Sequence, residues 1–204
     1  MNKWLYKGQH GFRPRYLCES RIVKVCQDIA DSLNDGARMD TTVIDSSKAY
    51  SLVQYGRLLM KMVASGMDSR VVVWVREFLS GHSHRVRVGG CLSEEVRVIS
   101  RVSQGSILGP LLFLEYVNAI WRNLESAIKL FADDRIICRK VMNDSDIDTL
   151  QRDLDGLGEW AVENAMKINP DKSKAVSFTR AWVKDSLNCF LGTIKFWKQA
   201  AANV

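Results

Sequence analysis

Three aspartates are the residues of this sequence best suited to chemistry. Asp45 ends a short β-branched stretch, and Asp133 and Asp134 lie between two apolar stretches. Only folding can bring them together, because 133 − 45 = 88 positions separate them. Crowded carboxylates repel one another unless a cation is present, and two Mg²⁺ ions about 3.5–4 Å apart can drive phosphoryl transfer. The three aspartates are therefore candidate metal ligands and catalytic residues. On spacing alone the alternative is an ordinary turn, which aspartate favours.

The elements that must position these aspartates predict an α+β fold. A strand over residues 41–44 runs into Asp45, and strands over 127–131 and 135–138 flank the aspartate pair, so residues 131–135 should connect a β-hairpin. A second hairpin is expected over 84–99 around Gly89 and Gly90. Apolar spacing predicts helices over 22–33, 58–63, 71–79, 111–124 and 147–160, then a last strand over 174–178. Gly36 and Gly66 are expected to end the first two helices, Asp68 and Ser145 to cap the start of the third and fifth, and Pro110 to open the fourth at its first turn. We expect a largely antiparallel sheet with helices on one face.

The composition narrows the classes of function. The 204 residues are 47% hydrophobic and 25% charged, which suits one globular unit or one plus an appendage. A net charge of +6 permits a polyanionic partner but does not identify one. Five cysteines without a Cys-x-x-Cys pair, and no N-terminal apolar segment, favour a reduced intracellular setting. His82 and His84 have no cysteine pair nearby, so no zinc site is expected. No apolar run approaches the roughly 18 residues of a membrane span.

Five short blocks follow one another along the chain: residues 9–14 (QHGFRP), 43–50 (VIDSSKAY), 102–113 (VSQGSILGPLLF), 131–134 (FADD) and 168–173 (INPDKS). In this order they resemble the fingers motif and the palm motifs A, B, C and D of reverse transcriptases from non-LTR (LINE-like) retrotransposons. The block at 102–113, which resembles motif B, is the most specific of the five. The ordered set covers the chain from about Gln9 to Phe178. The resemblance implies a polymerase palm, ferredoxin-like, with an antiparallel sheet and helices on one face.

The resemblance also implies a reaction, RNA-directed DNA synthesis with two Mg²⁺ ions, an RNA template, a DNA primer and deoxynucleoside triphosphates. Asp45 and Asp133 would bind the metals with Asp134 beside them. The nucleotide-binding residues that it implies are Tyr50, which would exclude a ribose 2′-hydroxyl, Gln104 and Gly105 against the nucleotide and template, Arg13 at the triphosphate, and Lys172 as proton donor to pyrophosphate. Four of them have an ordinary alternative: Tyr50 as a core tyrosine, Gly105 as a loop glycine, Arg13 as a solvated arginine and Lys172 as a surface lysine.

Several positions depart from the family's usual motifs. Ser46 stands where an aromatic residue is usual, and Ser51 where an acid is usual; the other departures are Arg101, Ser103, Ala119 and Arg135. Arg135 follows the aspartate pair where a small polar residue is usual. A cation there would either compete with Mg²⁺ or point outward on its strand. The metal-binding aspartates are retained, but the residues that support them are altered.

We expect partial fingers over residues 1–39, a palm with a returning fingers segment over 40–180, and a truncated tail over 181–204 without a thumb. Residues 190–192 (FLG) resemble a primer-grip motif. Two other classes stay open. A catalytically inactive remnant that at most binds nucleic acid is favoured by the departures and the short ends. A different two-metal palm enzyme, such as a nucleotidyl cyclase, would not need the block at 102–113. The sequence does not indicate an oligomeric state.

Overall fold

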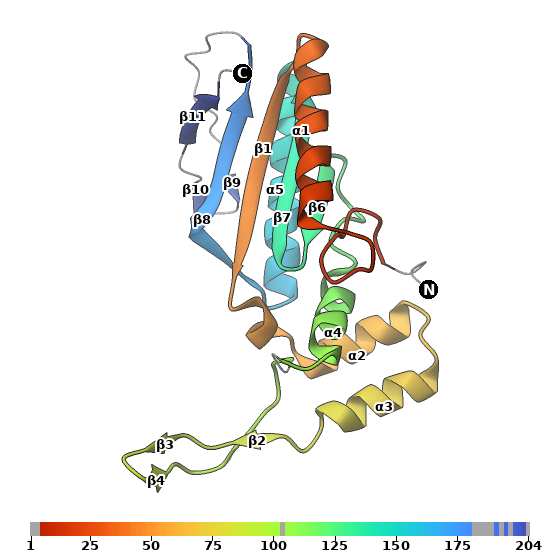
Figure 1. Cartoon of the computed structure of the whole chain (residues 1–204), viewed down its shortest axis with the longest axis vertical. Helices are drawn as coiled ribbons and strands as arrows, with labels where there is room; N and C mark the ends of the chain where they lie inside the picture. The colour runs from red at the N-terminus through yellow and green to blue at the C-terminus, as the bar shows by residue number, and fades with distance from the viewer. Residues whose placement is uncertain (1–4, 103–104, 181–189, 192–193, 196–197, 203–204) are drawn as a thin grey trace. The chain divides into compact units, whose positions relative to one another are not determined.

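The computed structural model describes residues 5–102, 105–180, 190–191, 194–195 and 198–202 (Figure 1). The chain forms two compact units. One, which we call the sheet unit, contains Leu5–Ser47 and Asn118–Val204, and the other, the inserted unit, contains Lys48–Val117. The inserted unit therefore interrupts the sheet unit in sequence. The boundaries expected at 39/40 and 180/181 stay predictions.

The sheet unit is built on a five-stranded sheet in the order β11-β8-β1-β7-β6. Its central strand β1 (Arg38–Ser47) pairs antiparallel with β7 (Asp134–Val141) and with β8 (Lys167–Phe178). Strand β6 (Ala127–Phe131) pairs antiparallel with β7, and β11 (Lys198–Ala202) runs parallel to β8. Strands β9 (Phe190–Leu191) and β10 (Ile194–Lys195) form a separate pair. The predicted mixed α+β fold with a largely antiparallel sheet is confirmed.

Helices cover both faces of this sheet (Figure 1). Helix α5 (Asp144–Glu163) packs Leu150, Leu154 and Leu157 against Ile44 and Ile137 to form the core. Helix α1 (Cys18–Asn34) lies on the other face, where its Arg21 donates to the Lys129 carbonyl at 3.1 Å and its Asp28 pairs with the Lys129 side chain. We expected helices on one face. The buried residues of α1 include the polar Arg21 and Ser32, and Arg21 lies with Ile22 beside Phe131 and Ile136 of the sheet. Apolar spacing predicted the helix over 22–33 but did not indicate which face of the sheet it covers.

Most predicted helix ends agree with the structure, and two do not. The chain turns at Gly36, with a φ of 73°, directly after α1, as expected. Helix α5 is capped by Asn143, whose side chain accepts from the Asp146 amide, rather than by Ser145. Helix α4 (Leu108–Val117) stops well before residue 124. The next residue, Asn118, accepts a hydrogen bond from the Tyr6 amide at 2.9 Å, a long-range contact that periodicity does not reveal.

The inserted unit holds the short helix η1 (Ala49–Leu52), then α2 (Tyr55–Ala64), α3 (Ser69–Leu79) and α4. Helix α2 packs against both α3 and α4. Asp68 caps α3 by accepting from the Arg70 amide, as predicted. Two short antiparallel pairs form the expected hairpin: β2 (Ser83–His84) with β5 (Val96–Arg97), and β3 (Arg87–Val88) with β4 (Cys91–Leu92). Gly89 and Gly90 both have positive φ, which the tightest hairpin turns require.

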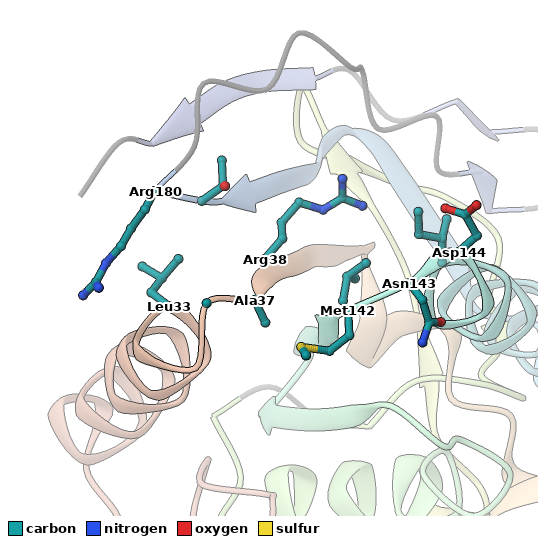
Figure 2. A pocket seen from close by; sticks show the side chains of 11 residues that line it. Leu33, Ala37, Arg38, Met142, Asn143, Asp144 and Arg180 are labelled. Carbon is teal, nitrogen blue, oxygen red and sulfur yellow. The ribbon is translucent and has the colours of Figure 1, made fainter.

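A cavity of about 410 Å³ opens at the end of β1 that is opposite Asp45 (Figure 2). Its lining includes Leu33, Arg38, Asn143 and Arg180. Arg38 is the first residue of β1, whereas Asp45 is the eighth, so this cavity is not the site of the aspartates. Among the helices of the described residues, none combines the length and the apolar character needed to cross a membrane.

Candidate active site

The strand register brings the three aspartates to one end of the sheet. The last paired residues of β1 and β7 are Ile44 and Arg135, so Asp45 on β1 and Asp134 on β7 each stand one residue beyond that pair. Asp133 precedes Asp134 in the turn between β6 and β7, where Phe131 pairs with Asp134. The predicted hairpin around the aspartate pair is therefore confirmed, with Asp134 and Arg135 already in the strand. Asp45 and Asp133 are half-buried and Asp134 is exposed.

Asp45 lies at an irregularity of the sheet. The pairing of β1 with β8 shifts register between Val43 and Asp45. At this shift the Asp45 amide donates to the Ser173 hydroxyl at 3.1 Å, and that hydroxyl donates to the Asn169 carbonyl at 2.7 Å. Bulges of this kind redirect a side chain and are common beside active sites. Ser173 therefore fixes the backbone from which the Asp45 carboxylate projects.

Gln9 holds the turn that carries Asp133. Its side chain is 2% exposed. The Gln9 Oε1 atom accepts from the amides of Gly11 and Ala132 at 2.8 and 3.0 Å, and Nε2 donates to the Ala132 carbonyl at 3.4 Å. Ala132 has a φ of 55°, a conformation that alanine rarely adopts without support. A Cβ on Gly11 would lie 2.3 Å from the Ala132 nitrogen, so glycine is required at this close approach.

The charges around the turn oppose one another. Partial burial raises the pKa of Asp134, and the negative charges of Asp133 and Asp45 raise it further, while Arg21 and Arg135 act in the other direction. Arg21, on α1, is buried, and burial lowers its pKa against the favourable charge of Asp134. Its guanidinium lies 5.8 Å from the centre of the Phe131 ring. The carboxylates thus repel one another beside a cation supplied by α1.

Arg135 points into the protein. It is 1% exposed, donates from Nη1 to the Ser46 hydroxyl at 2.6 Å, and lies over the Trp160 ring at 5.6 Å. Of the two alternatives for Arg135, the one in which it points outward on its strand is therefore wrong. Alternation along β7 places Asp134 on one face and Arg135 on the face covered by α5. Burial lowers the pKa of Arg135 to about 10, and the charges of Asp133, Asp134 and Asp45 resist that fall.

The donor chemistry of the three aspartates fits a divalent cation. Carboxylate oxygens are the hard, anionic ligands that Mg²⁺ prefers, and the repulsion that raises the pKa of Asp134 is what such a cation would relieve. Within the described ranges, no three His, Cys, Asp or Glu side chains already stand together as a metal-holding group. Asp45, Asp133 and Asp134 are the residues that would hold the cation, which would supply the positive charge that offsets their repulsion.

The other predicted site residues have varied surroundings. Arg13 donates from Nη1 to the Tyr6 and Gln9 carbonyls, both at 3.0 Å, and stacks over Tyr16, so it holds the loop before α1. Lys172 is exposed on β8, next to Ser173.

In the inserted unit, the Tyr50 ring stacks on Phe113 with centroids 4.4 Å apart, and Gly105 has a φ of 90° that favours glycine. Gln104, Ser103 and Gly192 lie outside the described residues. The nucleotide-binding roles stay predictions.

Three residues near the aspartates were not assigned a role from the sequence: Gln9, Arg21 and Ser173. Gln9 lies in the first of the five blocks, but nothing local indicates that its side chain reaches a turn 123 positions away. Arg21 resembles any polar residue of an amphipathic helix, and Ser173 any residue of a polar loop. Their partners are set by the tertiary fold, and a contact of that range leaves no pattern in one sequence.

A family model described as reverse transcriptase (RNA-dependent DNA polymerase) matches residues 4–196. The chain belongs to the reverse transcriptase family. Among curated proteins, this reverse transcriptase sequence is 27% identical over 184 residues to the RNA-directed DNA polymerase from mobile element jockey of Drosophila funebris, covering 86% of the chain and 20% of that protein. It is also 27% identical over 177 residues to the probable RNA-directed DNA polymerase from transposon X-element of Drosophila melanogaster, covering 84% of the chain and 19% of that protein. The predicted resemblance to non-LTR retrotransposon enzymes is confirmed, and the chain spans about a fifth of the length of these relatives.

Solved structures agree on the fold. Apo telomerase from Candida tropicalis, truncated from its C-terminal domain, superimposes with a TM-score of 0.61 at 11% identity and covers 87% of this reverse transcriptase chain and 37% of its own. Telomerase from Candida albicans in complex with a fragment of telomeric RNA gives a TM-score of 0.57 at 12% identity, covering 75% of this chain and 31% of its own. At such identities the likeness concerns the fold alone.

Proposed function

We propose that this chain is the palm-containing part of an RNA-directed DNA polymerase, in which Asp45, Asp133 and Asp134 hold two Mg²⁺ ions. The observation that supports this most is the register of β1 with β7, because it sets Asp45 and Asp134 one residue beyond the same backbone pair. Family membership supports the reaction type. The substrates proposed are an RNA template, a DNA primer and deoxynucleoside triphosphates.

In the proposed reaction, the primer 3′-hydroxyl loses its proton to water and its oxygen forms a bond to the α-phosphorus of the nucleotide. The bond from that phosphorus to the bridging oxygen breaks, and pyrophosphate leaves. When bound, the metal ions supply activation of the attacking oxygen and charge stabilisation of the leaving group. The chain's own contribution is positional. Ser173 fixes the backbone at Asp45, and Gln9 fixes the turn at Asp133, so the carboxylates are presented from supported backbone.

The nucleotide would be held by residues of the predicted motifs. Tyr50 is backed by the Phe113 ring, which suits a flat surface that excludes a 2′-hydroxyl by sterics. Gly105 allows close approach of backbone to a ligand. Lys172 is exposed and one residue from Ser173, which supports its proposed role as a proton donor to pyrophosphate. Arg13 is the weakest of these assignments, since its Nη1 atom is already engaged by two carbonyls.

The test is primer extension on an RNA template with Mg²⁺ and deoxynucleotides, using the purified chain beside Asp133→Ala. We expect templated addition that the substitution abolishes. Addition that survives Asp133→Ala would refute the assignment of the site. A parallel reaction with ribonucleotides, in the chain and in Tyr50→Ala, tests sugar selection, and the substitution should admit ribonucleotides.

A second candidate is a chain that binds nucleic acid without synthesising DNA. The buried cation at Arg135, close enough to act on all three carboxylates, favours it, since a resident positive charge opposes metal occupancy. The two functions separate cleanly in experiment. Retention of a labelled primer–template hybrid on the chain, with no Asp133-dependent extension at any Mg²⁺ concentration, would support binding alone.

A further inference from the structure

Arg135 and Ser46 are two departures from the family's usual motifs, and the structure puts them in contact. They lie 89 positions apart in sequence, yet Arg135 Nη1 donates to the Ser46 hydroxyl at 2.6 Å. Ile44, the strand partner of Arg135, is part of the core under α5, so Ser46 and Arg135 both point to that face. The pair therefore joins β1 to β7 directly behind Asp45 and Asp134.

The sizes of the two side chains are complementary. Ser46 is 5% exposed and Arg135 is 1% exposed, so neither can move into solvent without repacking. The guanidinium fills the space between the Ser46 hydroxyl and the Trp160 ring. A large side chain at position 46 would enter that same space. A small residue at 46 therefore accommodates a long residue at 135, and overfilling a packed interior is destabilising.

The charge of Arg135 also needs compensation. A buried guanidinium is costly unless anions lie near it. Among the ion pairs of the described residues, none includes Arg135, and its Nη2 atom has no hydrogen-bond partner in that part of the chain. Arg135 directly follows Asp134 on β7, and its strand partner Ile44 directly precedes Asp45 on β1, so the anions at this end of the sheet are next to it. Together with Asp133, these charges favour its cationic form. The aspartates and Arg135 thus compensate one another across the sheet.

We propose that Arg135, together with Ser46, is a resident counter-charge and positioning residue for the three aspartates, and that it sets the affinity of their site for divalent cations. With Arg135 in place the metal-free carboxylates are partly neutralised, and each arriving cation meets a positive charge. The site then binds divalent cations more weakly than it would with a neutral residue at position 135. This part rests on the proposed function, because it assumes that the aspartates bind metal. The packing of Arg135 against Ser46 does not.

The metal arm is tested by titrating the full chain with Mn²⁺ and following free Mn²⁺ by electron paramagnetic resonance. Arg135→Met removes the charge and keeps much of the volume, Arg135→Lys keeps the charge, and Asp133→Asn removes a ligand. We expect Arg135→Met to bind Mn²⁺ about three- to tenfold more tightly, since a nearby unit charge in partly solvated protein acts on this scale. Arg135→Lys should stay within about twofold of the wild type, and Asp133→Asn should bind more weakly.

The outcomes separate the two ideas. If binding depends on Asp133 but Arg135→Met binds no more tightly than the wild type, the counter-charge role is overturned while the proposed function stands. If neither the wild type nor Arg135→Met binds Mn²⁺ in an Asp133-dependent way, the metal site itself fails, and the counter-charge role with it. A purely structural role for Arg135 would predict that the Lys and Met variants change stability while both leave the Mn²⁺ affinity unchanged.

The packing arm needs no metal. Chemical denaturation of Ser46→Phe, Arg135→Thr and the double variant forms a double-mutant cycle. We expect each single change to destabilise the chain and the double variant to be more stable than the two effects combined, by at least about tenfold in the unfolding equilibrium constant. If Ser46→Phe does not fold, Ser46→Val replaces it in the cycle. Additive effects would overturn the coupling of the two positions.

Discussion

Replacing Gln9 with methionine should destabilise the chain by about 2–6 kcal/mol. Methionine nearly conserves the volume of the side chain but cannot accept the two amide hydrogen bonds from Gly11 and Ala132. Both amides belong to buried residues, and leaving a buried donor without a partner costs about 1–3 kcal/mol each. The longer bond from Nε2 to the Ala132 carbonyl, at 3.4 Å, adds little. The sum is a large share of the roughly 5–15 kcal/mol that stabilises a typical domain.

The measurement is urea denaturation, with Gln27→Met as the matched control. Gln27 is exposed on α1, and within the described part of the chain its side chain bonds only to Asp31. Its replacement should therefore change the free energy of unfolding by no more than about 0.5 kcal/mol. Native-state hydrogen exchange adds a local readout, because the Ala132 amide should exchange faster in Gln9→Met than in the wild type. If Gln9→Met is as stable as Gln27→Met and hydrogen exchange at the Ala132 amide is unchanged, the role of Gln9 in holding the turn is refuted.

Three further predictions test separate parts of the structure. Gly11→Ala should be strongly destabilising, because the new Cβ would lie 2.3 Å from the Ala132 nitrogen. The control Gly156→Ala, in the middle of α5, meets nothing within 4 Å and should stabilise by about 0.5–1 kcal/mol. Thermal melts compare the two variants, and equal changes in stability would contradict the close approach at Gly11. Asp153→Ala should cost about 2–4 kcal/mol, because its buried carboxylate accepts from the Glu125 and Ser126 amides, and exposed Asp155→Ala is the control in urea denaturation. Burial raises the pKa of Asp40, so the folded state binds the proton of the Asp40 carboxyl more tightly than the unfolded state does. The contribution of Asp40 to the free energy of unfolding therefore falls as pH rises from the ordinary carboxyl range to the raised pKa. The stability of Asp40→Asn relative to wild type should therefore increase across that interval in denaturation at successive pH values, and a constant difference would contradict the sign.

The sequence predicted those parts of the fold that depend on local chemistry. Asp68 was identified as a cap because its short carboxylate can accept from an amide in the first turn, and it accepts from Arg70. Gly36 and Gly66 were expected to end helices, and both have positive φ directly after one. Near α5, Asn143 and Ser145 both suit a cap, and local chemistry did not distinguish them.

The placement of the three aspartates at one end of the sheet was predictable, and the residues that support them were not. Asp45, Asp133 and Asp134 follow from strands that lead into or out of them, and the register brings these strand ends together. The inward direction of Arg135 follows from alternation on β7, but the acceptor on Ser46 is what makes burial of a guanidinium tolerable, and that contact is non-local. Gln9 and Ser173 were missed for the same reason: each acts on backbone more than 100 positions away.

The position of β1 in the sheet has a consequence for synthesis of the chain. Both strands that pair with β1 come later in the sequence, and 134 − 47 = 87 positions separate the end of β1 from the start of β7. At about 5–20 residues per second, roughly 4–17 s pass on the ribosome before β1 meets its first partner. During that time the β-branched segment Thr41, Thr42, Val43 and Ile44 has unpaired edges on both sides, which is the condition that favours aggregation. The inserted unit is made in this interval, so it can fold before the sheet that surrounds it in sequence, and chains that stop short of β7 should be the ones that chaperones retain.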